Sequence, residues 1–409
     1  MRYVIAGNGA AAAGCIEGIR SVDPDGKITV ISEEEHHVYS RPLISYYLEG
    51  KTDTERMKYR PDDFYDCNGC EVIYGVKAEK LNAEKHSVTL TDGRELPYDR
   101  LCVATGSVPF VPPVEGIDTV KDWTCFMKLD EALKLESMID SGSDVLIVGA
   151  GLIGLKCAEG ISGRVKSITV CDLADRVLSS ILDAECAGRV QEHLEKNGIR
   201  FMLSDTAVRF DGNTAYMKSG AEVGFDVLVM AVGVRACTSF FRDAGGEVGR
   251  GIKVSAKMET SLPDVYAAGD CTEGEDISSG TARVLAIMPN AYIQGHTAGA
   301  NMAGGEEVFD CAIPMNSIGF FGLHMMTAGS YDGDKIIRDT GNSVRRFFVK
   351  DGTLRGFILI GETERAGIYT YLIRERIPLY TLTDGFADVP ATNAIFSSET
   401  RGKRFGGAV

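Results

Sequence analysis

The residues best suited to chemistry in this chain are glycines that directly follow short apolar strands. Near the N-terminus an apolar run leads into Gly7-x-Gly9-x-x-Ala12, and small residues typical of a helix follow. Gly7 suits the tight turn, Gly9 lets backbone approach a pyrophosphate, and Ala12 permits close packing of helix on strand. The first N–H groups of such a helix carry partial positive charge and bind phosphate, so we expect Ala10 and Ala11 at the site.

A carboxylate stands where such a site needs one. The next apolar strand, residues 27–32, ends at Glu33, 26 residues after Gly7. A carboxylate at this point accepts hydrogen bonds from the ribose diol of a dinucleotide. The order of strand, glycine turn, helix, strand and acid therefore predicts a dinucleotide-binding unit.

The same order occurs a second time in the chain. An apolar strand at 143–148 runs into Gly149-Ala150-Gly151-Leu152-Ile153-Gly154, and the strand at 167–171 ends at Asp172, 23 residues after Gly149. Two such patterns predict two bound dinucleotides, and the economical pair is FAD with a nicotinamide. Asp172 favours NADH, because a carboxylate pairs with a ribose 2′-hydroxyl and repels a 2′-phosphate.

Composition limits the remaining possibilities. The 409 residues are 44% hydrophobic and 25% charged, with a net charge of -15, which indicates globular domains and disfavours nucleic-acid binding. The 11 scattered cysteines argue against a secreted disulfide framework, so we expect a reducing cytoplasm. Because an apolar strand starts at the first residues, we expect no signal peptide. The longest apolar run, about residues 145–155, is shorter than the ~18 residues of a membrane span. The 47 glycines, about 11%, exceed the usual share near 7%.

Further motifs extend along the chain in a fixed order. They lie at residues 39–43, 104–107, 231–235, 266–271 and 290–295. With the two glycine turns, they resemble the FAD- and NAD-dependent pyridine nucleotide-disulfide oxidoreductase superfamily. The branch most similar contains NADH:rubredoxin reductases and the flavin part of NADH-nitrite reductases.

This resemblance assigns roles to further residues. Arg41 and Pro42 are expected to pass the pyrophosphate and flavin, Asp270 to hold the ribityl chain, and the helix after Pro289 to point its N-terminus at the flavin. The resemblance implies FAD contacts at Arg41, Pro42, Ala78, Ala104, Thr105, Gly106, Gly269, Asp270, Pro289 and Gln294. It implies nicotinamide dinucleotide contacts at Ala231 and Gly233. We also expect Gly295 to lie close to a cofactor.

The resemblance implies an α/β fold of two nested Rossmann-like domains with an α+β C-terminal interface domain. The expected FAD domain comprises residues 1–115 and 245–310, and the NAD domain comprises 116–244. The interface domain is expected at 311–409, where Asp351-Gly352 is a typical hairpin turn between two strands.

Cysteine is missing where thiol chemistry at the flavin would need it. Disulfide reductases of this superfamily carry Cys-x4-Cys in the stretch that corresponds to residues 36–47, and NADH oxidases carry one cysteine near Pro42; neither is present. Cys67 and Cys70 form a separate Cys-x2-Cys. They are either a redox dithiol or incidental, and a metal would need two more ligands than this pair offers.

One departure from the relatives concerns a charged pair near the flavin. Rubredoxin and ferredoxin reductases often have a lysine after Arg-Pro and a glutamate on the second nucleotide helix, and the corresponding residues here are Tyr46 and Lys156. We expect Lys156 to approach flavin N5 and to support negative charge on reduced flavin. The alternative is a solvated helix lysine paired with Glu159.

The motifs and the resemblance predict an FAD-dependent NADH:acceptor oxidoreductase without a redox-active disulfide. Hydride would pass from NADH to flavin, and single electrons to a rubredoxin, a ferredoxin or an iron–sulfur partner. Three alternatives stay open: an electron-input subunit of a larger metalloenzyme such as a nitrite reductase, an NADH oxidase, or a flavin-bound redox sensor. We expect a cytoplasmic protein, either a homodimer or part of a hetero-oligomer, with no resident metal.

Overall fold

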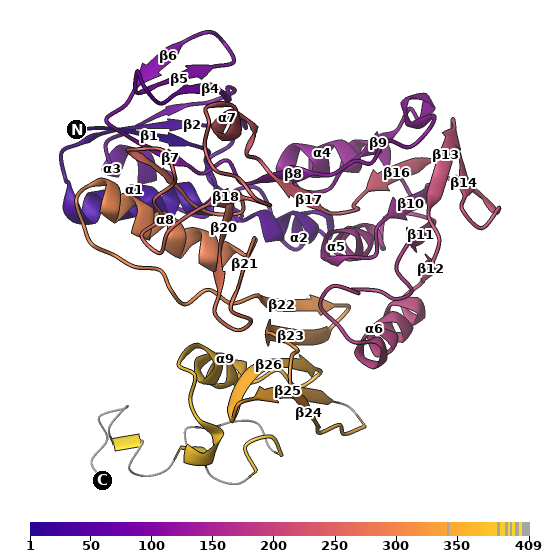
Figure 1. Ribbon diagram of the computed structural model, residues 1–409. Coiled ribbons are helices and arrows are strands. Elements are labelled where there is room, and N and C mark those ends of the chain that lie inside the picture. The colour runs from indigo at the N-terminus through magenta and orange to yellow at the C-terminus, as the bar shows by residue number, and fades with distance from the viewer. Residues whose placement is uncertain (342, 383–384, 389–391, 393–394, 397–400, 403–409) are drawn as a thin grey trace. The chain divides into compact units, whose positions relative to one another are not determined.

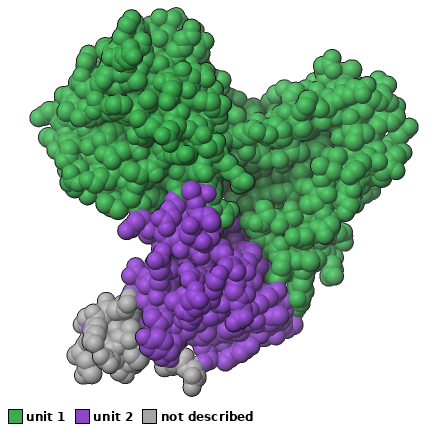
Figure 2. Space-filling model, viewed as in Figure 1, with its two compact units in different colours: residues 1–274, 283–309 green, residues 275–282, 310–409 purple. Residues whose placement is uncertain are grey.

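The structure is a computed structural model that describes residues 1–341, 343–382, 385–388, 392, 395–396 and 401–402. Its chain divides into two compact units (Figure 2). The first unit comprises residues 1–274 and 283–309, and the second comprises 275–282 and 310–409. None of the described helices combines the length and the apolar character that crossing a membrane requires.

A five-stranded parallel sheet forms one half of the first unit (Figure 1). Its strands, in sheet order, are β19 (Val265–Ala267), β7 (Arg100–Val103), β1 (Arg2–Ala6), β2 (Lys27–Ile31) and β3 (Cys70–Ile73). Most of their residues are buried, as expected for parallel strands covered on both faces. The antiparallel strands β4 (Ala78–Asn82), β5 (Ser87–Leu90) and β6 (Glu95–Pro97), with the short helix α7 (Ser239–Asp243), contribute to the same apolar core.

Two helices, α1 (Ala10–Val22) and α8 (Met288–Met302), pack unusually closely beside this sheet. A Cβ atom on Gly14 would lie 2.2 Å from the Tyr292 carbonyl oxygen, and one on Gly295 would lie 2.0 Å from that of Ala11. Gly18 and Gly299 show equally close approaches. Gly295 was expected beside a cofactor, but the structure shows that helix–helix packing is what requires a glycine there.

A second five-stranded parallel sheet forms the other half of the first unit. In sheet order its strands are β12 (Ile199–Leu203), β11 (Ser167–Asp172), β10 (Asp144–Val148), β16 (Val227–Met230) and β9 (Trp123–Thr124). Three helices and an antiparallel meander belong to this half: α4 (Leu129–Met138), α5 (Leu152–Ile161), α6 (Ala184–Lys196), β13 (Ala207–Asp211), β14 (Thr214–Met217) and β15 (Glu222–Gly224). These two parallel sheets confirm the predicted α/β class with Rossmann-like units.

The chain passes between the two sheets through short elements. Residues 123–230, which hold the second sheet, lie in sequence between β7 and β19 of the first. Strands β8 (Ser107–Pro109) and β17 (Val234–Ala236) pair antiparallel where the chain leaves and returns. Other short elements of the first unit are α2 (Ile44–Leu48), α3 (Phe64–Cys67), β18 (Ile252–Lys253) and the 3-10 turns at Arg41–Leu43 and Ile117–Thr119. Strands β20 (Thr272–Asp276) and β21 (Thr281–Arg283) continue into the second unit.

The second unit contains an antiparallel sheet and a helix. In sheet order its strands are β22 (Met315–Phe320), β23 (Leu323–Gly329), β26 (Thr353–Ile360), β25 (Val344–Lys350) and β24 (Asp334–Ile337). Helix α9 (Ala366–Arg374) shares an apolar core with this sheet. Asp351 and Gly352 both have positive φ between β25 and β26, which confirms the predicted two-residue hairpin.

Candidate dinucleotide sites

Both parallel sheets end in the same kind of glycine turn beside the central strand. Gly7 follows β1 with φ of +124°, and a Cβ there would lie 2.0 Å from the carbonyl oxygen of Ala104 after β7. Gly149 follows β10 with φ of +119°, and its Cβ would lie 2.2 Å from the oxygen of Ala231 after β16. Connections leave the central strand in opposite directions at these points, which is where open α/β sheets bind ligands.

The second glycine of each turn faces open space instead. A Cβ on Gly9 or Gly151 would meet no protein atom within 4 Å. Both residues are extended N-caps, of α1 and α5, and neither provides a side-chain cap for the first N–H groups. A pyrophosphate can accept hydrogen bonds from the uncapped N–H groups of such a helix, and the open space beside the glycine lets it come close to the backbone. These residues therefore fit a dinucleotide.

The other residues predicted for the two glycine turns lie at the first positions of helices α1 and α5. Ala10 is the half-buried first residue of α1, and Ala11 is buried. Leu152 and Ile153 open α5 and are both half-buried. A Cβ on Gly154 would lie 2.0 Å from the Gly149 carbonyl oxygen. This third glycine is therefore needed because the backbone at the start of α5 packs tightly against the first residue of the turn.

The two carboxylates after the second strands have different partners. Glu33 forms ion pairs with Lys77 Nζ at 2.7 Å and Lys128 Nζ at 3.0 Å. Burial alone would raise the pKa of Glu33, but these two hydrogen bonds outweigh it and the pKa is lowered. Asp172 accepts backbone hydrogen bonds instead, at 2.7 Å from Ala150 N and at 2.8 Å from Ala174 N. Asp172 therefore also fixes the conformation of the second glycine turn.

Arg41 lies beside a carboxylate that sequence reasoning missed. Its Nη2 atom is 2.5 Å from Glu34 Oε1, and the Tyr39 hydroxyl donates to Glu34 Oε2 at 2.7 Å. Pro42 follows in the 3-10 turn. The three consecutive glutamates at 33–35 were the available sequence signal for Glu34.

Burial raises the pKa of Asp270, although a hydrogen bond from Ser107 and the positive charge of Arg41 oppose this.

Several predicted residues hold the segments beside the first turn. The side-chain oxygen of Gln294 accepts from Gly269 N at 2.8 Å and so fastens α8 to the turn that carries Asp270. The Thr105 hydroxyl donates to the Cys237 carbonyl at 2.7 Å. Gly106 and Gly233 both have positive φ, and a Cβ on either would meet no atom within 4 Å. Pro289 is in the first turn of α8, and the half-buried Ala78 opens β4.

Lys156 has two identified neighbours. Its Nζ atom forms an ion pair with Glu159, one helical turn along α5, and lies 4.8 Å from the centre of the Tyr46 ring. The positions that correspond to the lysine–glutamate pair of rubredoxin reductases are thus in contact here too. The approach of Lys156 to flavin N5 stays a prediction.

The cysteine pair 67/70 shows no sign of activation. A hydrogen bond to Asp63 raises the pKa of the exposed Cys67 thiol, and burial raises that of Cys70 to about 11. Both sulfurs are free thiols. Among the described residues, no three histidine, cysteine or acidic side chains are grouped as a metal ion would need.

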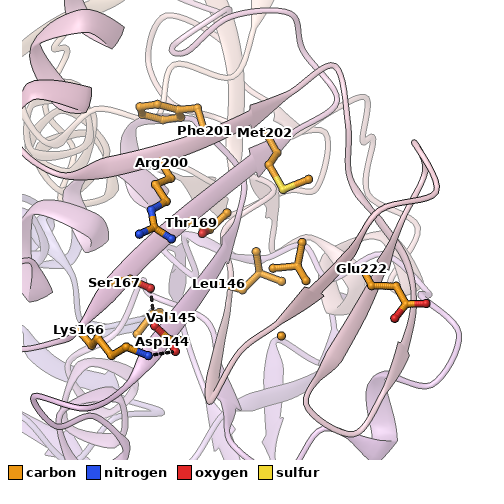
Figure 3. A pocket seen from close by; sticks show the side chains of 12 residues that line it. Asp144, Val145, Leu146, Lys166, Ser167, Thr169, Arg200, Phe201, Met202 and Glu222 are labelled. Atoms are coloured by element: carbon orange, nitrogen blue, oxygen red, sulfur yellow. Dashed lines mark hydrogen bonds and ion pairs between the residues drawn. The ribbon is translucent and has the colours of Figure 1, made fainter.

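A hollow of about 710 Å³ lies elsewhere on the second sheet (Figure 3). Its lining includes Asp144 and Ser167, the first residues of β10 and β11, with Arg200 and Met202 on β12. The glycine turn follows the opposite, C-terminal end of these strands. None of the predicted site residues lines the hollow, so it is separate from the dinucleotide sites.

Comparison with known proteins identifies the family. Residues 1–295 match the family described as pyridine nucleotide-disulphide oxidoreductase. The chain belongs to this family. It is therefore an FAD-dependent NAD(H) oxidoreductase, as its motifs predict.

Three similar proteins cover most of the chain. The epsilon subunit of the NADH-dependent phenylglyoxylate dehydrogenase of Aromatoleum evansii is 32% identical over 404 residues, 95% of each chain. Nitrite reductase [NAD(P)H] of Bacillus subtilis (strain 168) is 29% identical over 400 residues, which are 96% of this chain and 48% of that protein. The solved NAD-dependent persulfide reductase from A. fulgidus has a TM-score of 0.88 at 25% identity, covering 99% of this chain and 84% of that one.

Proposed function

We propose that this protein exchanges electrons between NADH and a one-electron, iron–sulfur-type partner, and that it works as the flavin subunit of a larger enzyme. The observation that carries this proposal is the pair of dinucleotide cradles without a cysteine in the segment 36–47. A second carrier must therefore take the electrons from the flavin directly. The end-to-end similarity to a subunit of an NADH-dependent dehydrogenase supports assembly with a partner.

The chain's own residues bind and align the two dinucleotides. We assign Gly7, Gly9 and the first N–H groups of α1 to the FAD pyrophosphate, and the turn from Gly149 to Gly154 to NADH. Bound FAD supplies hydride acceptance and one-electron release. Alignment of the reactants is the main task of the protein, since well-oriented partners need no side-chain acid or base for hydride transfer.

The other predicted contacts belong to the same proposal. Glu33 and Asp172 would receive the ribose hydroxyls, and Asp172 would favour NADH over NADPH. The remaining FAD contacts proposed are Arg41, Pro42, Ala78, Ala104, Thr105, Gly106, Gly269, Asp270, Pro289 and Gln294, with Ala231 and Gly233 at NADH.

A free NADH:rubredoxin or NADH:ferredoxin reductase is the second candidate. In this case the acceptor would be a separate rubredoxin or ferredoxin that takes electrons from the flavin. We place the reaction in the cytoplasm, because none of the 11 cysteines forms a disulfide.

Anaerobic purification of the tagged chain from its native cells tests this proposal. The expected result is bound FAD that NADH bleaches within seconds, together with a co-purified polypeptide that contains iron and acid-labile sulfide. FAD-loaded protein that reduces added rubredoxin but carries no partner would favour the free reductase. Rapid NADH turnover with oxygen as sole acceptor would identify an oxidase, and no turnover with any dye would refute an enzymatic role.

A further inference from the structure

Helix α2, from the FAD-binding part, packs against α5, which begins at the second glycine turn. A Cβ on Gly160 of α5 would lie 3.0 Å from the Ser45 carbonyl oxygen and 3.4 Å from Leu48 Cβ, so the two helices approach closely. Because α2 directly follows Arg41 and Pro42, this contact links the segments proposed to hold the two dinucleotides.

The Tyr46 ring covers a charged pair at this contact. The Lys156 ammonium, 4.8 Å from the ring centre, is close enough for a cation–π interaction. The side chains of Lys156 and its partner Glu159 are only 14% and 7% exposed, whereas Tyr46 is 37% exposed. The ring therefore shields the ion pair from solvent, and such partly desolvated cation–π contacts are the stronger ones.

A separate polar network holds the last two residues of the same helix. The Tyr47 hydroxyl donates to Glu136 Oε2 at 2.8 Å, and Arg164 donates to Glu136 Oε1 at 2.8 Å. Arg164 also donates to the Leu48 carbonyl at 3.2 Å. Glu136 lies on α4 and Arg164 follows α5, so α2 is tied to the NAD-binding part through two independent contacts.

We propose that Tyr46 and Lys156 act together as a positioning pair, which fixes α5 and the NADH held at its N-terminus relative to the flavin. This inference rests on the function proposed above. Lys156 stands five residues after Gly151, so a shift of its side chain moves the turn that receives the pyrophosphate. A misplacement of about 1 Å between reactants costs as much as 100-fold in rate.

The charges around Tyr46 are paired, so we infer that Lys156 acts by positioning α5 and not by stabilising negative charge on the flavin. The Glu159 carboxylate neutralises Lys156, and Lys51, whose Nζ atom is 5.8 Å from the centre of the Tyr46 ring, is paired with Glu49. Two compensated ammonium groups around one ring produce little net field. The closer contact, from the mostly buried Lys156 at 4.8 Å, still holds the ring in place.

Four variants test the pair in the FAD-loaded holoenzyme: Tyr46→Leu, Lys156→Met, the double variant and Tyr46→Phe. We expect Tyr46→Leu and Lys156→Met each to slow flavin reduction by NADH by about 10- to 100-fold in anaerobic stopped flow. The double variant should reduce flavin no more slowly than the slower of the two single variants. Tyr46→Phe, which keeps the ring, should match the rate of the wild type. Tyr216→Leu is the matched control, since it removes a similar contact with Arg209, 3.8 Å from the ring centre, on the meander.

Two readouts separate positioning from other roles. The long-wavelength charge-transfer absorbance of reduced enzyme with NAD⁺ should weaken in the slow variants. The flavin midpoint potential, measured with dyes, should stay unchanged in Tyr46→Leu, which leaves the Lys156–Glu159 ion pair intact. A midpoint potential that moves in Tyr46→Leu, additive losses in the double variant, or a Tyr46→Leu enzyme of normal rate would overturn the positioning pair. Wild-type holoenzyme that NADH does not reduce would refute the proposed function instead.

Discussion

Replacement of Gly9 by alanine separates the two reasons for which glycine occupies these turns. The structure predicts that Gly9→Ala leaves the apoprotein intact, because its φ is -106° and a Cβ would meet no atom within 4 Å. Reduced freedom of the unfolded chain contributes about 0.4–1 kcal/mol in its favour, and the poorer helix cap costs about as much. The free energy of unfolding should therefore change by less than about 1 kcal/mol.

Gly7→Ala, two residues earlier, should behave in the opposite way. Its positive φ costs about 1–3 kcal/mol, and overlap with the Ala104 carbonyl, 2.0 Å from the new Cβ, costs about 1–3 kcal/mol more. A loss of about 2–6 kcal/mol is a large part of the stability of a typical domain, about 5–15 kcal/mol. Urea denaturation of the two apoproteins, followed by circular dichroism, measures this difference.

FAD binding gives the decisive result for Gly9. If backbone approaches the pyrophosphate there, the new methyl group fills that space, and the affinity should fall by at least about tenfold, or about 1.4 kcal/mol. Quenching of FAD fluorescence on titration with apoprotein measures the affinity. Gly151→Ala is the matched control and should weaken NADH while leaving FAD binding unchanged. A Gly9→Ala protein that binds FAD as tightly as the wild type would refute the assignment of this cradle.

Three further outcomes follow from the structure. Gly14→Ala should destabilise the protein by about 1–3 kcal/mol through overlap between α1 and α8, whereas Gly188→Ala, within α6 and facing no atom within 4 Å, should stabilise it by about 0.5–1 kcal/mol; thermal melts compare the two. Asp172→Ala should reduce kcat/KM for NADH about tenfold or more. Steady-state kinetics with both nucleotides should also show a smaller ratio of kcat/KM for NADH to kcat/KM for NADPH. Burial opposes ionisation of Glu136, but hydrogen bonds from Arg164 and a tyrosine lower its pKa below the ordinary 4.5. The contribution of Glu136 to the free energy of unfolding is therefore present above pH 4.5 and is lost as the pH falls below that value. Glu136→Gln should lower the free energy of unfolding by up to about 1 kcal/mol at pH 7 and by almost nothing near pH 3, as measured by urea denaturation.

Local sequence order was enough to predict the two glycine turns, and the family resemblance predicted the fold class. A strand, two glycines, a helix and an acid report on neighbours a few residues apart, and the structure has both units where the pattern indicates. The carbonyl partners of the first glycines, Ala104 and Ala231, directly follow strands that lie beside the central ones, and only the structure revealed them. The division into domains and the individual cofactor contacts stay predictions.

Contacts between distant side chains were outside the reach of this reasoning. Glu136 meets Tyr47 across 89 positions of sequence, whereas the meeting of Tyr46 and Lys156 was indicated only by the charged pair that relatives carry at these positions. No local period or motif encodes such pairs, since they depend on how α2, α4 and α5 pack. The same limit explains Gly295, whose close neighbour proved to be the Ala11 backbone of another helix.

The glycine excess therefore has two physical causes that the count alone could not separate. At Gly7, Gly149 and Gly295 the space of a side chain is filled by backbone of the same protein, and glycine is needed to fold. At Gly9 and Gly151 that space is open, so folding does not require glycine there. A position that folding leaves open, at a helix N-terminus without a side-chain cap, is explained by what binds there. Because this arrangement occurs once in each sheet, two dinucleotides account for it more simply than one.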